Sequence, residues 1–77
     1  MNSFIEKKVG ANVRRERERA GLTQDALAAR FQLSGLDITR SAVAKIEVGQ
    51  RHLYPDEIIL LKAILGCSYE DLLEIEN

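Results

Sequence analysis

The sequence has no tryptophan and few of the residues that small β-sheet or disulfide-rich domains use. Among 77 residues there are one cysteine, one proline, two phenylalanines and two tyrosines. Strands favour aromatic side chains, and the turns between them need glycine and proline, so this composition predicts an all-α fold. The length suffices for one compact domain, residues 1–77, and leaves no room for a second.

Side chains that carry chemistry are also scarce. Cys67 has no second cysteine for a disulfide, and no neighbouring cysteine or histidine that would complete a metal site. We therefore expect it to be a small buried apolar residue. The single histidine and the scattered carboxylates give no nucleophile with its base and no phosphate loop, which argues against an enzyme. The sequence predicts no metal, no cofactor and no small-molecule ligand.

Long hydrophobic runs are missing as well. The N-terminal segment MNSFIEKKVGANVRRERERAG lacks the unbroken apolar stretch of a signal peptide, and no later segment approaches the length of a membrane span. The sequence therefore predicts a cytoplasmic protein with no membrane partner.

The charges are unevenly distributed along the chain. A net charge of −1 at first argues against a nucleic-acid ligand. However, residues 1–51 contain ten basic and six acidic residues, whereas residues 52–77 contain one basic and six acidic residues. A basic front and an acidic back give the molecule one face that suits an anion.

The first predicted helix covers residues 4–20. Ser3 and Glu6 have the spacing of a capping box, and Gly21 is placed to end the helix in the left-handed conformation. The apolar stripe of this helix passes over Arg17, so that an arginine lies where the core should be. Such a residue should need a carboxylate partner.

The second and third predicted helices each begin after a threonine N-cap, Thr23 and Thr39. The third helix covers residues 40–48. Its inward side carries a single charge, Glu47, and its other side has almost no large apolar residue to bury. The inward side is made by Ala42, Val43, Ile46 and Glu47, and the other side by Arg40, Ser41, Ala44, Lys45 and Val48.

The fourth predicted helix is apolar, and the fifth is short. Pro55 begins the fourth helix and Gly66 ends it, and its side chains are apolar nearly all round, as expected of a helix in the middle of a bundle. Ser68 caps the fifth.

Three segments together resemble the lambda-repressor-like helix-turn-helix family of the Cro and repressor type. They are GLTQDALAARF, TRSAVAKIEVGQR and the Pro-started apolar helix that ends in LGCSYEDLL. The resemblance implies a compact five-helix domain whose second and third helices form the helix-turn-helix. It implies a DNA-binding transcriptional regulator of the repressor kind. It also implies a buried salt bridge between Arg17 and Glu47, the two residues that the apolar stripes single out.

In helix-turn-helix proteins the second helix of the motif enters the major groove of double-stranded DNA. The third predicted helix takes this place here. Arg40 can donate two hydrogen bonds to guanine, Ser41 can bond several bases, and Lys45 can reach guanine or a phosphate. The family resemblance puts base-reading side chains at these three positions, and Ala44 offers a methyl group to thymine.

Five residues are predicted to hold the phosphate backbone, which keeps the protein in register. Gln24 matches a family position that contacts the backbone, at the N-terminus of the second helix. Gln50 and Arg51 follow the third helix, where family members present backbone amides to phosphate. Asn12 and Arg14 on the first helix are the other two candidates.

One departure from the family is an insertion between Phe31 and Thr39. Family members have a short turn here. Either the second helix continues through part of this segment, or the loop bulges.

A homodimer is expected on DNA, because one helix covers only a few base pairs and the family reads two half-sites. The predicted interface is in the acidic C-terminal half, at Leu72, Leu73 and Ile75. The alternative is an antitoxin-like or other interaction module that binds a partner protein through the same acidic half.

Overall fold

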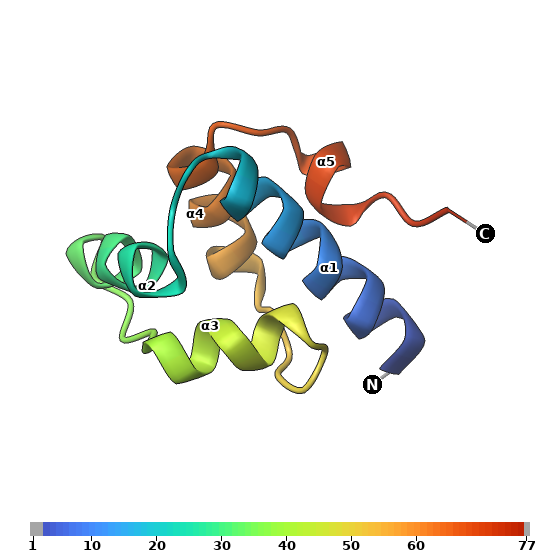
Figure 1. Ribbon diagram of the computed structural model, residues 1–77, viewed down its shortest axis with the longest axis horizontal. Coiled ribbons are helices and arrows are strands. Elements are labelled where there is room, and N and C mark those ends of the chain that lie inside the picture. Colours follow the sequence, from blue (N-terminus) through green and yellow to red (C-terminus); the bar gives the residue numbers. More distant parts are fainter. Residues whose placement is uncertain (1–2, 77) are drawn as a thin grey trace.

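The computed structural model describes residues 3–76, and within this range it contains five helices and no strand. The all-α prediction is therefore confirmed. Figure 1 shows α1 running diagonally across the molecule, with α3 along its lower side and α5 at the opposite side. The helices are α1 (Ser3–Arg19), α2 (Gln24–Leu33), α3 (Arg40–Glu47), α4 (Pro55–Leu65) and α5 (Tyr69–Leu73).

The ends of α1 differ in how well the sequence predicts them. Gly21 has a φ of 74° and follows the end of the helix, as predicted. Ser3 lies within α1 and not at its N-cap, and among residues 3–76 no capping hydrogen bond joins Ser3 and Glu6. The carboxylate of Glu6 instead lies 2.9 Å from Nδ1 of His52 and ties α1 to the loop between α3 and α4.

The inserted segment between Phe31 and Thr39 combines a longer helix with a packed loop. α2 continues to Leu33, and the chain then turns so that the N–H of Leu36 donates to the carbonyl oxygen of Phe31 at 3.0 Å. Ile38, which precedes the N-cap Thr39, is 3% exposed and belongs to the core. The insertion thus adds apolar side chains to the core and leads directly into α3.

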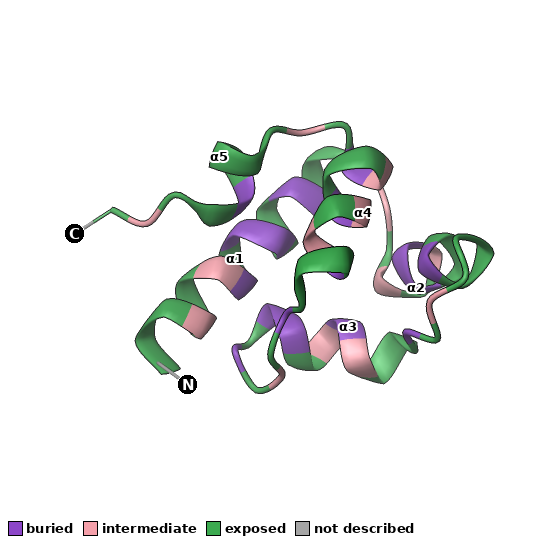
Figure 2. Ribbon diagram, turned by 180° about the vertical axis from the view of Figure 1, so that it is seen from behind, coloured by how far each residue is buried: buried purple, intermediate pink, exposed green. Residues whose placement is uncertain are grey.

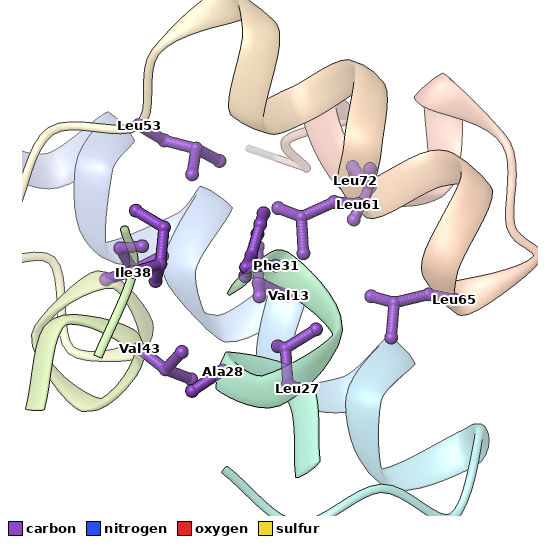
Figure 3. Close-up of a cluster of buried hydrophobic side chains, with 11 residues drawn as sticks. Val13, Leu27, Ala28, Phe31, Ile38, Val43, Leu53, Leu61, Leu65 and Leu72 are labelled. Atoms are coloured by element: carbon purple, nitrogen blue, oxygen red, sulfur yellow. The ribbon is translucent and has the colours of Figure 1, made fainter. Parts of the chain in front are cut away.

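The core lies where α1, α2, α3 and α4 meet, and α5 closes it from one side (Figure 3). Phe31 and Leu27 from α2 are the largest fully buried side chains, together with Leu61 from α4 and Leu72 from α5. Burying a side chain of this size stabilises the fold by about 1.5 to 3 kcal/mol. The core therefore depends on every helix, including the shortest.

The prediction that α4 is buried on all sides is wrong. Leu61 and Leu65 face the core, but Ile59 is 56% exposed. One side of α4 therefore faces solvent, and the helix does not lie in the middle of a bundle.

No helix within residues 3–76 is long and apolar enough to cross a membrane. Cys67 is half-buried, and its burial raises the pKa of the thiol.

Helix α1 also binds the C-terminal ends of α4 and α5. Arg19 donates to the carbonyl oxygen of Leu65 at 3.3 Å, and Arg15 donates to that of Asp71 at 2.7 Å. Between them the buried carboxylate of Glu16 accepts a hydrogen bond from each arginine, at 3.2 Å from Arg15 and 2.6 Å from Arg19. These two arginines therefore bind the ends of α4 and α5 near the protein surface, where the last carbonyl groups of a helix otherwise lack partners within the helix.

Candidate nucleic-acid interface

Helix α3 is fixed in direction by its cap and by its buried side. The hydroxyl oxygen of Thr39 accepts a hydrogen bond from the N–H of Ala42 at 3.1 Å. Val43 and Ile46 are 1% and 3% exposed, and they press the helix onto the core. The helical pattern predicted this side correctly.

The opposite side of α3 faces solvent and carries the four predicted base-reading residues. Arg40, Ser41 and Lys45 are exposed, and Ala44 is half-buried. Within the described residues no other helix packs over this side, which lies at the edge of the molecule (Figures 1 and 2). A helix with one uncovered polar side has the shape that fits a major groove.

The predicted pair between Arg17 and Glu47 is present and joins α1 to α3. The Nε of Arg17 lies 2.6 Å from Oε2 of Glu47, and the Nη2 lies 3.1 Å from Oε1. The two side chains are 10% and 2% exposed. The hydrogen bond to Glu47 raises the pKa of Arg17 and outweighs the opposite effect of burial. This bidentate contact holds the orientation of α3 against α1.

A close approach between α1 and α3 was missed in the sequence. A Cβ atom on Gly10 would lie 2.2 Å from the carbonyl oxygen of Ile46 and 2.8 Å from that of Glu47. Both are backbone atoms, which cannot move out of the way as a side chain can. A glycine inside a helical pattern is the one signal that points to such a crossing.

The N-terminus of α2 lies beside α3. Thr23 caps α2 by accepting from the N–H of Ala26 at 3.0 Å, and Gln24 is the first helical residue. The side-chain amide of Gln24 donates one hydrogen bond to Glu47 at 3.1 Å. Gln24 is therefore oriented by the buried pair, and its amide oxygen is not used in that bond. The next residue, Asp25, is exposed and lies near Arg40.

Two other predicted phosphate contacts have exposed side chains. Arg14 is 61% exposed and lies 3.6 Å from Glu18 on the same helix, a loose surface pair. Gln50 follows the end of α3 and is also exposed. Its backbone N–H, however, donates to the carbonyl oxygen of Lys45 at 2.8 Å, so this amide is not free for a phosphate.

The prediction that Asn12 binds phosphate is wrong. Asn12 is 9% exposed, and its side-chain nitrogen donates to the carbonyl oxygens of Leu72 and Glu74 at 3.0 and 2.9 Å. Its amide oxygen accepts from Arg15 at 3.1 Å. The side chain therefore attaches the C-terminal segment to α1.

Arg51 is also bound inside the protein. Its two terminal nitrogens lie 2.9 and 3.0 Å from the carboxylate oxygens of Glu57, whose side chain is 6% exposed. Burial would raise the pKa of Glu57, but hydrogen bonds from Arg51 and from the backbone N–H of Tyr54 bring it below its usual value. Glu57 thus compensates the charge of Arg51, and the phosphate contact at Arg51 stays a prediction.

The three residues predicted for a dimer interface have different surroundings. Leu72 is fully buried in the core, so it does not present a surface to a partner and the prediction is wrong for this residue. Leu73 is 42% exposed, and Ile75 is half-buried beside α1. Among residues 3–76 no group of histidine, cysteine and carboxylate side chains is placed to hold a metal ion.

The fold and the uncovered side of α3 define a helix-turn-helix protein. A family model described as helix-turn-helix matches residues 13–72, and the chain belongs to this family, of the Cro/C1 type. The structure is similar to the crystal structure of the DNA-binding domain of BldD, with a TM-score of 0.78 and 25% sequence identity. The alignment covers 95% of this chain and 99% of that one. A search of curated proteins gives no match.

Proposed function

We propose that this protein is a sequence-specific double-stranded DNA-binding transcriptional regulator, acting as a repressor, that reads the major groove with α3. The observation that carries the proposal is the division of α3 into a side locked to the core and an uncovered side with Arg40, Ser41 and Lys45. A solved DNA-binding domain with the same arrangement of helices supports it. This role places the protein in the cytoplasm, with no catalytic activity of its own.

The proposed base contacts follow from donor and acceptor chemistry. The guanidinium of Arg40 can donate two hydrogen bonds to O6 and N7 of guanine, which is the commonest specific contact. Ser41 lies beside it, and Lys45 lies just over one turn further along the same side. Ala44 presents a methyl group between them, which suits a thymine methyl.

The proposed phosphate contacts are Gln24, Arg14 and the side chain of Gln50. Gln24 is at the N-terminus of α2, where the helix dipole attracts an anion. These residues position the protein, whereas the α3 side chains select the sequence.

The proposed assembly on DNA is a homodimer, because a single α3 covers only a few base pairs. Leu73 and Ile75 are the proposed apolar contacts of the interface. The rival candidate is a protein-interaction module, which is favoured by Tyr69 and Leu73, both 42% exposed on α5 among acidic side chains. A partner protein would then occupy the surface that the dimer would use.

Selection of bound sequences from a random DNA pool tests the proposal and yields the best site. Affinity is then measured for that site and for a scrambled duplex at several salt concentrations. Arg40→Ala should weaken binding to the best site by about 1 to 3 kcal/mol and relax the preference at one base pair in each half-site. An equal loss on both duplexes would mean that Arg40 only holds the backbone.

Arg14→Ala should behave differently from Arg40→Ala. It should weaken binding to both duplexes alike and make the salt dependence shallower by about 0.9 for each phosphate that the variant no longer neutralises in the complex. Arg30→Ala is the matched control, because Arg30 is an exposed arginine in the last turn of α2, at the opposite end of that helix from Gln24. Absence of any binding at low salt would overturn the proposal and favour the interaction module.

A further inference from the structure

Asp25 lies beside the arginine that is proposed to read guanine. It is the second residue of α2, and its Oδ1 lies 3.9 Å from Nε of Arg40, the first residue of α3. The two side chains are 76% and 67% exposed. The pair therefore bridges the N-termini of the two motif helices on the solvent side, outside the core.

Two ordinary roles for Asp25 need no DNA. An acidic residue in the first turn of a helix stabilises the helix dipole, and an exposed ion pair contributes little to stability. The first role would be filled by a carboxylate anywhere in that turn, whereas the second depends on the position beside Arg40. The position beside Arg40 has an additional consequence, because Asp25 follows Gln24, a proposed phosphate contact, and the backbone of DNA would pass close to its negative charge.

We propose that Asp25 is a positioning residue that raises the sequence specificity of Arg40, an inference that rests on the proposed function. A guanidinium has five N–H donors in a rigid fork, and guanine needs two of them. A carboxylate 3.9 Å from Nε attracts that side of the guanidinium through its charge and leaves the two terminal nitrogens free for O6 and N7 of guanine.

The negative charge of Asp25 also disfavours a contact between Arg40 and a DNA phosphate, which competes with its contact to guanine. On DNA without the cognate base, an arginine at this place swings to a phosphate, and there Asp25 repels that phosphate. One unit-charge repulsion at ~5 Å in water weakens binding by about three- to fivefold. On the cognate site, the pre-oriented contact to guanine offsets the repulsion. Asp25 thus lowers affinity for all DNA but lowers it less for the correct site.

The test compares wild type, Asp25→Asn and Asp25→Glu on the selected site and on a scrambled duplex at one low salt concentration. For each protomer bound, Asp25→Asn should tighten binding to the scrambled duplex by about three- to fivefold and to the selected site by less than about twofold, so the ratio of the two affinities falls. Asp25→Glu keeps the negative charge, and its ratio of affinities should stay close to that of wild type.

Two controls separate positioning from net charge. Asp56→Asn changes the net charge equally in the first turn of α4, outside the proposed dimer surface, and it should shift both duplexes alike and only slightly. In an Arg40→Ala background, Asp25→Asn should no longer change the ratio, because the residue that it positions is missing.

The inference is overturned if Asp25→Asn tightens both duplexes by the same factor, or if its effect on the ratio persists without Arg40. A wild-type protein that binds both duplexes equally would instead refute the proposed function, and the inference with it.

Discussion

Removal of the Glu47 charge is the sharpest test of how α3 is held. The carboxylate accepts from Nε and Nη2 of Arg17 and from the amide of Gln24, at 2.6, 3.1 and 3.1 Å. Its side chain is 2% exposed. Glu47→Gln keeps the shape but leaves the buried guanidinium without a counter-ion, with the carbonyl oxygen of Leu22 at 2.8 Å as a neutral partner. Breaking a buried pair in this way costs about 3 to 5 kcal/mol.

This loss is large for a chain of this length. At about 0.05 to 0.15 kcal/mol per residue, the whole fold is worth roughly 4 to 12 kcal/mol. We therefore expect Glu47→Gln to move the urea midpoint far down or to leave a partly unfolded protein at 25 °C. The matched control is Glu18→Gln, whose partner Arg14 lies 3.6 Å away with both side chains more than half exposed. The control should lose no more than about 1 kcal/mol.

Equilibrium urea unfolding followed by circular dichroism measures both variants. If Glu47→Gln loses no more than the Glu18→Gln control, the charge is not desolvated and the reasoning is refuted. The double replacement Arg17→Met with Glu47→Leu should recover stability toward wild type, because no lone charge remains buried. A double variant as unstable as Glu47→Gln alone would show that missing hydrogen bonds and altered shape, rather than the unpaired charge, cause the loss.

The remaining predictions concern packing and pH. Gly10→Ala should destabilise the fold by about 1 to 3 kcal/mol in urea unfolding, because its Cβ would meet the backbone of α3. This loss outweighs the gain of about 0.5 to 1 kcal/mol that alanine gives over glycine inside a helix. A stabilised variant would show that the helices do not approach so closely. Leu72→Ala should lower the free energy of unfolding by about 2 to 5 kcal/mol, because Leu72 is fully buried. Leu73→Ala, half-exposed on the same helix, should lower it less and instead weaken dimerisation on DNA in sedimentation experiments. Equal losses of stability would contradict this difference in burial. Glu57 has a pKa below its ordinary value of 4.5, so its ionised form stabilises the native state above that pH, and this contribution is lost as the pH falls through the lower folded pKa. Glu57→Gln should accordingly be less stable than wild type at pH 7, with a difference that vanishes in acid; a difference that is constant with pH would mean that its bond to Arg51 does not involve the charge.

Local signals in the sequence determined where the helices begin and end. Thr23 and Thr39 are N-caps and Pro55 begins α4, as predicted, because a cap or a proline acts on the backbone within a few residues of itself. The apolar period likewise separated the buried side of α3 from its uncovered side. The pair between Arg17 and Glu47 followed from two charges on inward faces together with the family resemblance.

Only the tertiary structure decided which polar side chains are available to a ligand. Asn12 and Arg51 have the residue type of phosphate contacts. However, Asn12 binds carbonyl oxygens about sixty residues further along the chain, and Arg51 binds Glu57 in the first turn of α4. Similarly, Leu72 is indistinguishable in sequence from its neighbour Leu73, and the angle at which α5 meets α1 and α4 buries one and exposes the other. The physical reason is the same in each case. Caps and periodicity depend on neighbours along the chain, whereas exposure and hydrogen-bond partners depend on helices that are brought together only by the packing of the core.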